Sequence, residues 1–204
     1  MASYPAAGGP RLTDFLAGLP ILTRWLPGHS VVWQTGQQDG PDEPNPAHHT
    51  HCSAFAAAAA LYLDIYLLRP PNHGQIQLAN AQTAWLSGDL SYTGPNAADS
   101  GWMELGFSGT LGLLTTCQMA ANSGQIVLAC FAAAPPTPGH IAILRPRPDG
   151  STEIPPDGPS VIMAGTQNFL SVSMKAAFSN HPDAWPDNIA LFVHDTPLQD
   201  DVSA

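Results

Sequence analysis

Cys52 is the residue of this sequence whose surroundings best suit a nucleophile. It begins a long, Ala-rich apolar segment, and such a segment predicts a helix with Cys52 in its first turn. A helix N-terminus presents unpaired N–H groups and about half a positive charge. That charge is expected to lower the pKa of the thiol, and the N–H groups can hydrogen-bond an oxyanion beside the sulfur. The sequence therefore makes Cys52 a candidate nucleophile.

His140 is the candidate base that would accept the thiol proton. It follows a Pro-Gly pair and begins the segment His-Ile-Ala-Ile-Leu, whose pattern predicts a β-strand. A histidine at the start of a strand can point toward the end of a helix, where a third polar group has to hold its ring. Gln167 and Asn168 end the next predicted strand, and either side chain could accept the imidazole N–H.

The histidines before Cys52 allow a second interpretation. Residues 48–52 read His-His-Thr-His-Cys, and imidazole together with thiolate suits zinc or copper. Structural metal sites usually take their ligands from two separated segments, and no second ligand pair stands out in the sequence. We therefore expect no resident metal or other cofactor, and we keep a metal-dependent enzyme that uses His49, His51 and Cys52 as an alternative hypothesis.

The segments that must position these residues fall into two groups. Helices are predicted first, over residues 52–67, 79–86 and 109–121. Thr50 is the expected N-cap of the first helix, and the segment Arg69-Pro70-Pro71 is expected to stop it. Short β-branched segments follow and predict strands over residues 125–132, 140–145, 161–164 and 189–194. This order predicts an α+β fold in which N-terminal helices pack on an antiparallel β-sheet.

The composition divides the chain into three parts. Residues 1–46 are rich in Gly, Pro and Gln and predict a loop-rich N-terminal arm, with one short helix near residues 12–19 and a plain loop at 36–46. Residues 47–195 contain the predicted helices and strands and form the candidate catalytic domain. Residues 196–204 predict a frayed acidic tail.

The overall composition excludes several classes of partner. Only 11% of the 204 residues are charged, where roughly 25% is typical, and the formal net charge is −10. Nucleic-acid binding and an electrostatic membrane anchor are not expected, because both need clustered Lys and Arg. The 21 Pro and 18 Gly break the chain too often for membrane-spanning helices. The first ten residues show no secretory signal, and the three cysteines indicate reduced thiols in a protein made in the cytoplasm.

Four short segments, together with Gly101-Trp102 and residues 121–127, carry a resemblance to a known family. The four are His51-Cys52-Ser53-Ala54-Phe55, Leu78-Ala79-Asn80-Ala81-Gln82, Gly139-His140-Ile141-Ala142-Ile143 and Ala164-Gly165-Thr166-Gln167-Asn168. These segments resemble those of the papain-like cell-wall amidases, the NlpC-type and CHAP-type cysteine hydrolases, over about residues 47–195. The first and third segments most resemble the amidase effectors of bacterial type VI secretion.

The resemblance implies a papain-like fold and a set of residue roles. Cys52 would be the nucleophile, His140 the base, and Asn168, or Gln167, the residue that orients the imidazole. His51, Ser53 and Trp102 are the candidates for contact with substrate. The implied reaction is cleavage of an amide bond in peptidoglycan peptides, by a thiol hydrolase without a cofactor.

The resemblance also implies a biological setting, which the sequence leaves open. One setting is an antibacterial effector that has an immunity protein as partner and reaches a target-cell periplasm by a non-classical route. The other is a phage-type lysin. A catalytically dead papain-like fold that acts as a binding module is a further hypothesis.

Overall fold

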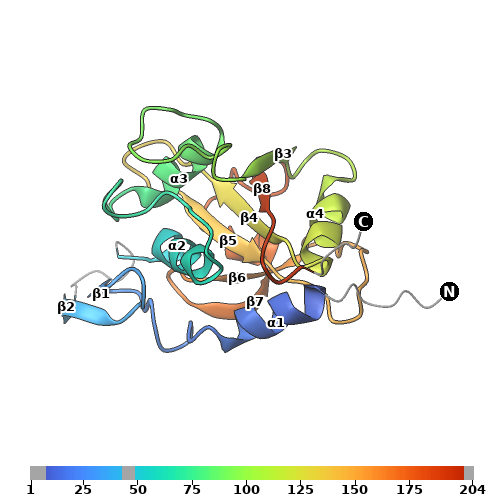
Figure 1. Ribbon diagram of the computed structural model, residues 1–204, viewed down its shortest axis with the longest axis horizontal. Coiled ribbons are helices and arrows are strands. Elements are labelled where there is room, and N and C mark those ends of the chain that lie inside the picture. The colour runs from blue at the N-terminus through green and yellow to red at the C-terminus, as the bar shows by residue number, and fades with distance from the viewer. Residues whose placement is uncertain (1–7, 43–48, 200–204) are drawn as a thin grey trace.

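An antiparallel sheet forms the centre of the molecule (Figure 1). The computed structural model describes residues 8–42 and 49–199, and within them six strands pair in the order β3-β8-β4-β5-β6-β7. These strands are β3 (Met103–Phe107), β4 (Ile126–Phe131), β5 (His140–Leu144), β6 (Ser160–Met163), β7 (Phe169–Ser173) and β8 (Ala190–His194). A separate antiparallel pair consists of β1 (His29–Val31) and β2 (Gln38–Asp42). All pairings within the six-stranded sheet are antiparallel.

Helices cover both faces of this sheet (Figure 1). In the described part of the chain they are α1 (Gly8–Gly18), α2 (Cys52–Tyr62), α3 (Leu78–Leu86), α4 (Leu113–Asn122) and α5 (Met174–Ala177). Strand side chains alternate between the faces, so Ile141 and Ile143 pack with α2 and α3, whereas Ala142 and Leu144 pack with α4 and α5. The predicted combination of helices with an antiparallel sheet is confirmed.

Helix α2 packs closely against strand β5 because most of its side chains are the small methyl groups of alanine. Every residue from Cys52 to Ala60 is buried, and the alanine run allows close approach to the sheet. The helix ends at Tyr62, five residues before the predicted end, because Asp64 adopts a left-handed conformation with φ 59°. Its N-cap is His51 and not Thr50, and no side chain caps it.

The N-terminal arm is part of the main core. Leu12, Leu16, Ile21 and Trp25 are fully buried and belong to the same apolar cluster as the residues of α2. The ring of Trp25 stands edge-on to that of Phe55, with centroids 5.4 Å apart. The predicted short helix is confirmed as α1, and part of the predicted plain loop at 36–46 is strand β2. A boundary at residue 46 would therefore cut through one continuous core.

The C-terminal segment is bonded to the rest of the protein within the described residues, which extend to residue 199. Thr196 is buried, and its hydroxyl donates a hydrogen bond to the carbonyl oxygen of Gly124. Residues 196–199 are therefore not frayed, and residues 200–204 of the predicted tail lie outside the described residues. No described helix combines the length and the apolar character that crossing a membrane requires.

Candidate active site

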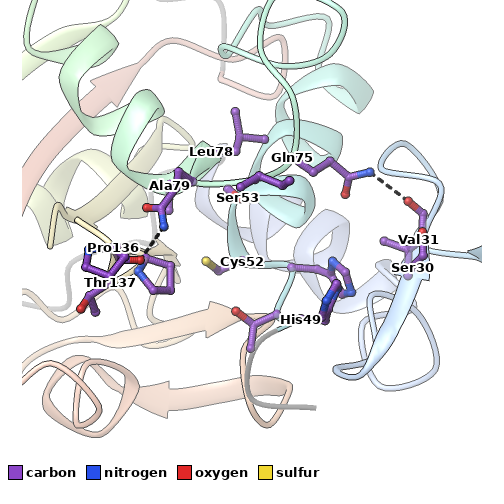
Figure 2. Close-up of a pocket in the computed structure, with 16 residues that line it drawn as sticks. Ser30, Val31, His49, Cys52, Ser53, Gln75, Leu78, Ala79, Pro136 and Thr137 are labelled. Atoms are coloured by element: carbon purple, nitrogen blue, oxygen red, sulfur yellow. Dashed lines mark hydrogen bonds between the residues drawn. The ribbon is translucent and has the colours of Figure 1, made fainter. Parts of the chain in front are cut away.

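A cleft of about 800 Å³ opens at the N-terminal end of α2 (Figure 2). Three parts of the chain form its walls: β1 with the residues before α2, the segment that leads into α3, and the proline-rich loop before β5. Its described lining is Ser30, Val31, His49, Thr50, His51, Cys52, Ser53, Gln75, Ile76, Gln77, Leu78, Ala79, Pro136, Thr137, Pro138 and Gly139. The predicted nucleophile thus lies in a cavity large enough for part of a peptide.

The thiol of Cys52 lies deep in this cleft, with 4% of the residue exposed. Figure 2 shows its sulfur directed toward the wall that contains Pro136 and Thr137. Burial raises the pKa of Cys52, and the backbone N–H groups of Ile141, Ser53 and Cys52 itself act in the opposite direction. The lowered pKa expected from the helix N-terminus is therefore wrong for this state of the protein, because desolvation of the thiolate outweighs those donors.

The ring of His140 lies on the opposite face of the sheet from Cys52. His140 begins β5, and the residue after it, Ile141, packs with Cys52, so alternation along the strand sends His140 the other way. Its Nε2 atom lies 3.3 Å from Sδ of Met163, and its ring stands edge-on to Phe178 with centroids 4.9 Å apart. Among the described residues no hydrogen bond joins Cys52 to His140.

Burial also decides the protonation of His140. Desolvation, assisted by the nearby His181 imidazole, lowers the pKa of His140 from its ordinary value of 6.5 to about 3. The two rings stack with centroids 6.0 Å apart. His140 is therefore neutral at neutral pH, which is the form that a general base requires.

This buried histidine predicts a specific acid sensitivity. The pKa of His140 is lower in the folded than in the unfolded protein, so the unfolded state binds the extra proton first as the pH falls from 6.5 toward 3. Between pH 7 and pH 5 we expect the free energy of unfolding to drop by about 2 kcal/mol more in the wild type than in His140→Gln. Urea denaturation of both proteins at the two pH values measures the difference. Equal losses in both proteins would contradict burial of the neutral ring.

Asn168 binds backbone groups and not the imidazole. Its Oδ1 accepts a hydrogen bond from the N–H of Gly165, and its Nδ2 donates to the carbonyl oxygens of Ile21, Arg24 and Trp25 at 2.7 to 3.2 Å. The amide therefore fastens the arm to the turn between β6 and β7. The structure does not bring Asn168 to His140, and Gln167 is exposed in the same turn.

Met163 occupies the position beside the His140 ring, and the sequence analysis missed it. It ends β6, whereas His140 begins the neighbouring antiparallel strand β5, so the two residues meet at the same end of these two strands. The signal was the order of strand start and strand end in adjacent antiparallel strands. A thioether is a weak hydrogen-bond acceptor, so the sequence favours the amides of Gln167 and Asn168 over Met163 as partners of the imidazole.

The three predicted substrate contacts have different positions. His51 and Ser53 line the cleft, and Nε2 of His51 lies 2.7 Å from the carbonyl oxygen of His29. Burial lowers the pKa of His51. Trp102 is buried elsewhere: its indole N–H donates to the carbonyl oxygen of Tyr66, and its ring stands edge-on to His194. Trp102 is not among the described residues that line the cleft.

The proposed metal ligands do not come together as a set. Within residues 8–42 and 49–199, no three His, Cys, Asp or Glu side chains are grouped closely enough to hold one metal ion. His49, His51 and Cys52 all lie in this range, and His48 lies outside the described residues. Figure 2 shows His49 on the far side of the helix start from the Cys52 sulfur.

Three amide side chains, one on the N-cap of α3 and two within the helix, hold the cleft walls in place, and their roles were not predicted. Asn80 Nδ2 donates to Gln77 Oε1 and to the carbonyl oxygen of Thr137, and Gln77 Nε2 donates to that of Pro136. These bonds fix the proline-rich loop against the start of α3. Gln82 is fully buried and donates to the carbonyl oxygens of Ser53 and Leu68, which ties α3 to the first turn of α2.

The walls and floor of the cleft thus come from segments far apart in sequence, with a cysteine at the start of a buried helix between them. The chain was also compared with known proteins. No family model matches it, and no curated protein matches its sequence.

Proposed function

We propose that this protein is a cysteine hydrolase of papain-like fold that cleaves an amide bond in peptidoglycan peptides. The observation that carries the proposal is the position of Cys52, at the N-terminus of α2 and in a cleft of about 800 Å³. The N–H groups of Ile141 and of the first turn of α2 approach its sulfur, and such donors stabilise both a thiolate and an oxyanion. The resemblance of the four short segments to cell-wall amidases supports the choice of substrate.

In the proposed reaction the Cys52 thiolate attacks the amide carbonyl carbon, and the C–N bond breaks as the tetrahedral intermediate collapses. The proton of the thiol passes through His140 to the leaving amine, and water then hydrolyses the thioester to release the acid. For this transfer the His140 ring has to leave its contact with Met163 and reach the cleft. The same movement would raise the pKa of His140 toward its ordinary value, because burial is the main cause of its depression.

Purified peptidoglycan sacculi test the proposal directly. We expect the wild-type protein to release new amino groups, and we expect prior treatment with iodoacetamide to stop the release, whereas a chelator leaves it unchanged. Loss with the chelator and survival after alkylation would instead favour the metal-dependent enzyme. No release above the alkylated sample, over a range of pH and sacculus sources, would refute cell-wall hydrolysis.

A binding module without turnover is the second candidate, and two observations favour it. Burial raises the pKa of Cys52, and the His140 ring packs against Phe178 on the other face of the sheet. The pH dependence of alkylation separates the two candidates. A midpoint at or above about 8.5, unchanged by added cell-wall peptides, supports the binding module. A lower midpoint with peptide bound supports the hydrolase.

The proposed setting follows from the proposed substrate. An antibacterial effector would be accompanied by an immunity protein that blocks the cleft in the producing cell, whereas a phage-type lysin would not. Co-purification of the protein with the product of a neighbouring gene, and loss of amine release in that complex, would identify the effector.

A further inference from the structure

Two helix N-termini meet at the cleft. The first turn of α2 contributes Cys52 and Ser53 to its lining, and the first turn of α3 contributes Leu78 and Ala79. Neither helix has an acidic residue in its first turn, and neither has a side chain that caps it. At both starts, therefore, no acidic or capping side chain of the described residues offsets the positive end of the helix dipole.

At the start of α3, a backbone N–H group has no acceptor among the described residues. The N–H of Leu78 donates to the carbonyl oxygen of Gln75 at 3.3 Å, and that of Ala81 donates to the carbonyl oxygen of Gln77 at 3.1 Å. The N–H of Ala79 lies between these two donors in sequence, and this N–H has no hydrogen-bond acceptor among the described residues. The side chain of the N-cap, Gln77, donates to Pro136 and is bonded by Asn80, so it does not serve this N–H. An N–H that the fold leaves open at a helix start can bind an anion.

A second and independent observation points to a ligand at the same place. Ser53 is only 6% exposed and lines the cleft, yet its hydroxyl has no hydrogen-bond partner within the described residues. Ser53 lines the same cleft as the first turn of α3 (Figure 2), and Gln82 of α3 donates a hydrogen bond to its carbonyl oxygen. Among the described residues the unpaired side-chain atoms that are sealed from solvent are Gln82 Oε1 and Gln118 Oε1, so the Ser53 oxygen keeps access to the cleft. This hydroxyl is therefore free to donate to a bound group.

The charge of the lining suits an anion. The protein carries a formal net charge of −10, but no Asp, Glu, Lys or Arg is among the described residues that line the cleft. A negative group at the start of α3 would therefore meet no carboxylate in the described lining. It would also meet no Lys or Arg there, so recognition has to come from N–H groups, hydroxyl groups and the two helix dipoles.

We propose that this end of the cleft binds a carboxylate of the substrate, held by the Ser53 hydroxyl and the Ala79 N–H. The inference rests on the proposed hydrolase function for the identity of the ligand as a substrate. The N–H groups around Cys52 would serve the reacting carbonyl, and those of α3 the carboxylate. The substrate class is thus a peptide with a free carboxylate close to the cleaved amide. That carboxylate is either the C-terminus or an acidic side chain.

Binding measurements in the Cys52→Ala background test this site without turnover. Three probes suffice: N-acetyl-Ala-Ala, its C-terminal amide, and N-acetyl-Ala-Glu with an amidated C-terminus. Calorimetry should show at least one carboxylate probe binding about tenfold more tightly than the neutral amide, and adding Ser53→Ala should remove most of that difference. The probe that binds identifies the source of the carboxylate. Ser123→Ala, on the opposite face of the sheet with its hydroxyl bonded to Ala120, is the matched control.

Two results would overturn the carboxylate site. One is equal affinity for the neutral and the anionic probes, including no measurable binding of any of them at millimolar concentration. The other is a carboxylate preference that Ser53→Ala leaves intact while its thermal unfolding matches that of the parent. Because the probes are not cleaved in this background, a carboxylate preference without amine release from sacculi by the wild type would refute cell-wall hydrolysis and leave the site standing.

Discussion

Replacement of Cys52 by alanine is expected to lower the rate of amine release from sacculi by about 10⁶-fold, to the level of a control without protein. The thiol is the only group in the described lining that can form a covalent acyl intermediate through sulfur. Without it, the N–H groups around the start of α2 can still polarise a carbonyl, but no bond forms to the carbonyl carbon. Released amines are followed with an amine-reactive dye over several hours.

The matched control is Cys117→Ala. Cys117 is a buried thiol of α4 on the other face of the sheet, and desolvation raises its pKa to about 12. It is therefore unreactive and remote from the cleft, so we expect its replacement to leave the rate of release within about twofold of wild type. Activity that survives in Cys52→Ala, or that is lost equally in both variants, would exclude Cys52 as the nucleophile.

Replacement of Trp25 by alanine is expected to destabilise the whole protein by about 3 to 5 kcal/mol. Trp25 is fully buried, its ring packs edge-on against Phe55 of α2, and its indole N–H donates to the carbonyl oxygen of Trp33 at 2.9 Å. Alanine would leave a large cavity between the arm and α2 and an acceptor without its donor. The measurement is the free energy of unfolding in urea, followed by circular dichroism.

Leu22→Ala in the same segment is the control for this prediction. Leu22 is 57% exposed, so its replacement should change the free energy of unfolding by less than about 0.5 kcal/mol. If residues 1–46 were an independent arm, Trp25→Ala would also have a small effect on the main unfolding transition. A loss below about 1 kcal/mol would therefore contradict a shared core.

The main helices and strands were predictable because their patterns are strong. The alanine run after Cys52 predicted α2, and the β-branched segments predicted β4, β5, β6 and β8. The sequence did not predict β3 and β7, whose residues are mostly half-buried or exposed and lack a clear alternation. Edge strands such as these depend on pairing with a neighbour more than on their own sequence.

The composition of residues 1–46 does not show that this arm belongs to the main core. Gly, Pro and Gln dominate residues 1–46, but a few large apolar side chains, Leu12, Leu16, Ile21 and Trp25, supply the core contacts. These residues are spaced too irregularly to form one periodic pattern beyond α1. Whether they face the core depends on tertiary contacts such as those of Asn168 with the carbonyl oxygens of Ile21 and Trp25.

The sequence was sufficient to identify the candidate nucleophile, but not the direction of the His140 ring or the pKa of Cys52. A cysteine that begins a helix can be recognised from the sequence, and the structure places it in a cleft. The direction of the His140 ring depends on the face to which the first residue of β5 points, and one residue of register reverses it. The pKa of Cys52 depends on burial, which outweighs the helix N-terminus and which the sequence does not encode locally.

The position of β8 has a consequence for how the protein is made. Of the described strands it comes last in sequence, yet it lies between β3 and β4 and is paired with both. During synthesis the ribosome delivers β3 and β4 long before β8, so the sheet remains in two pieces until residues 190–194 emerge. A nascent chain stalled earlier would expose the unpaired edges of both strands and would need protection from aggregation. We therefore expect the sheet to become continuous only once residues 190–194 have emerged from the ribosome.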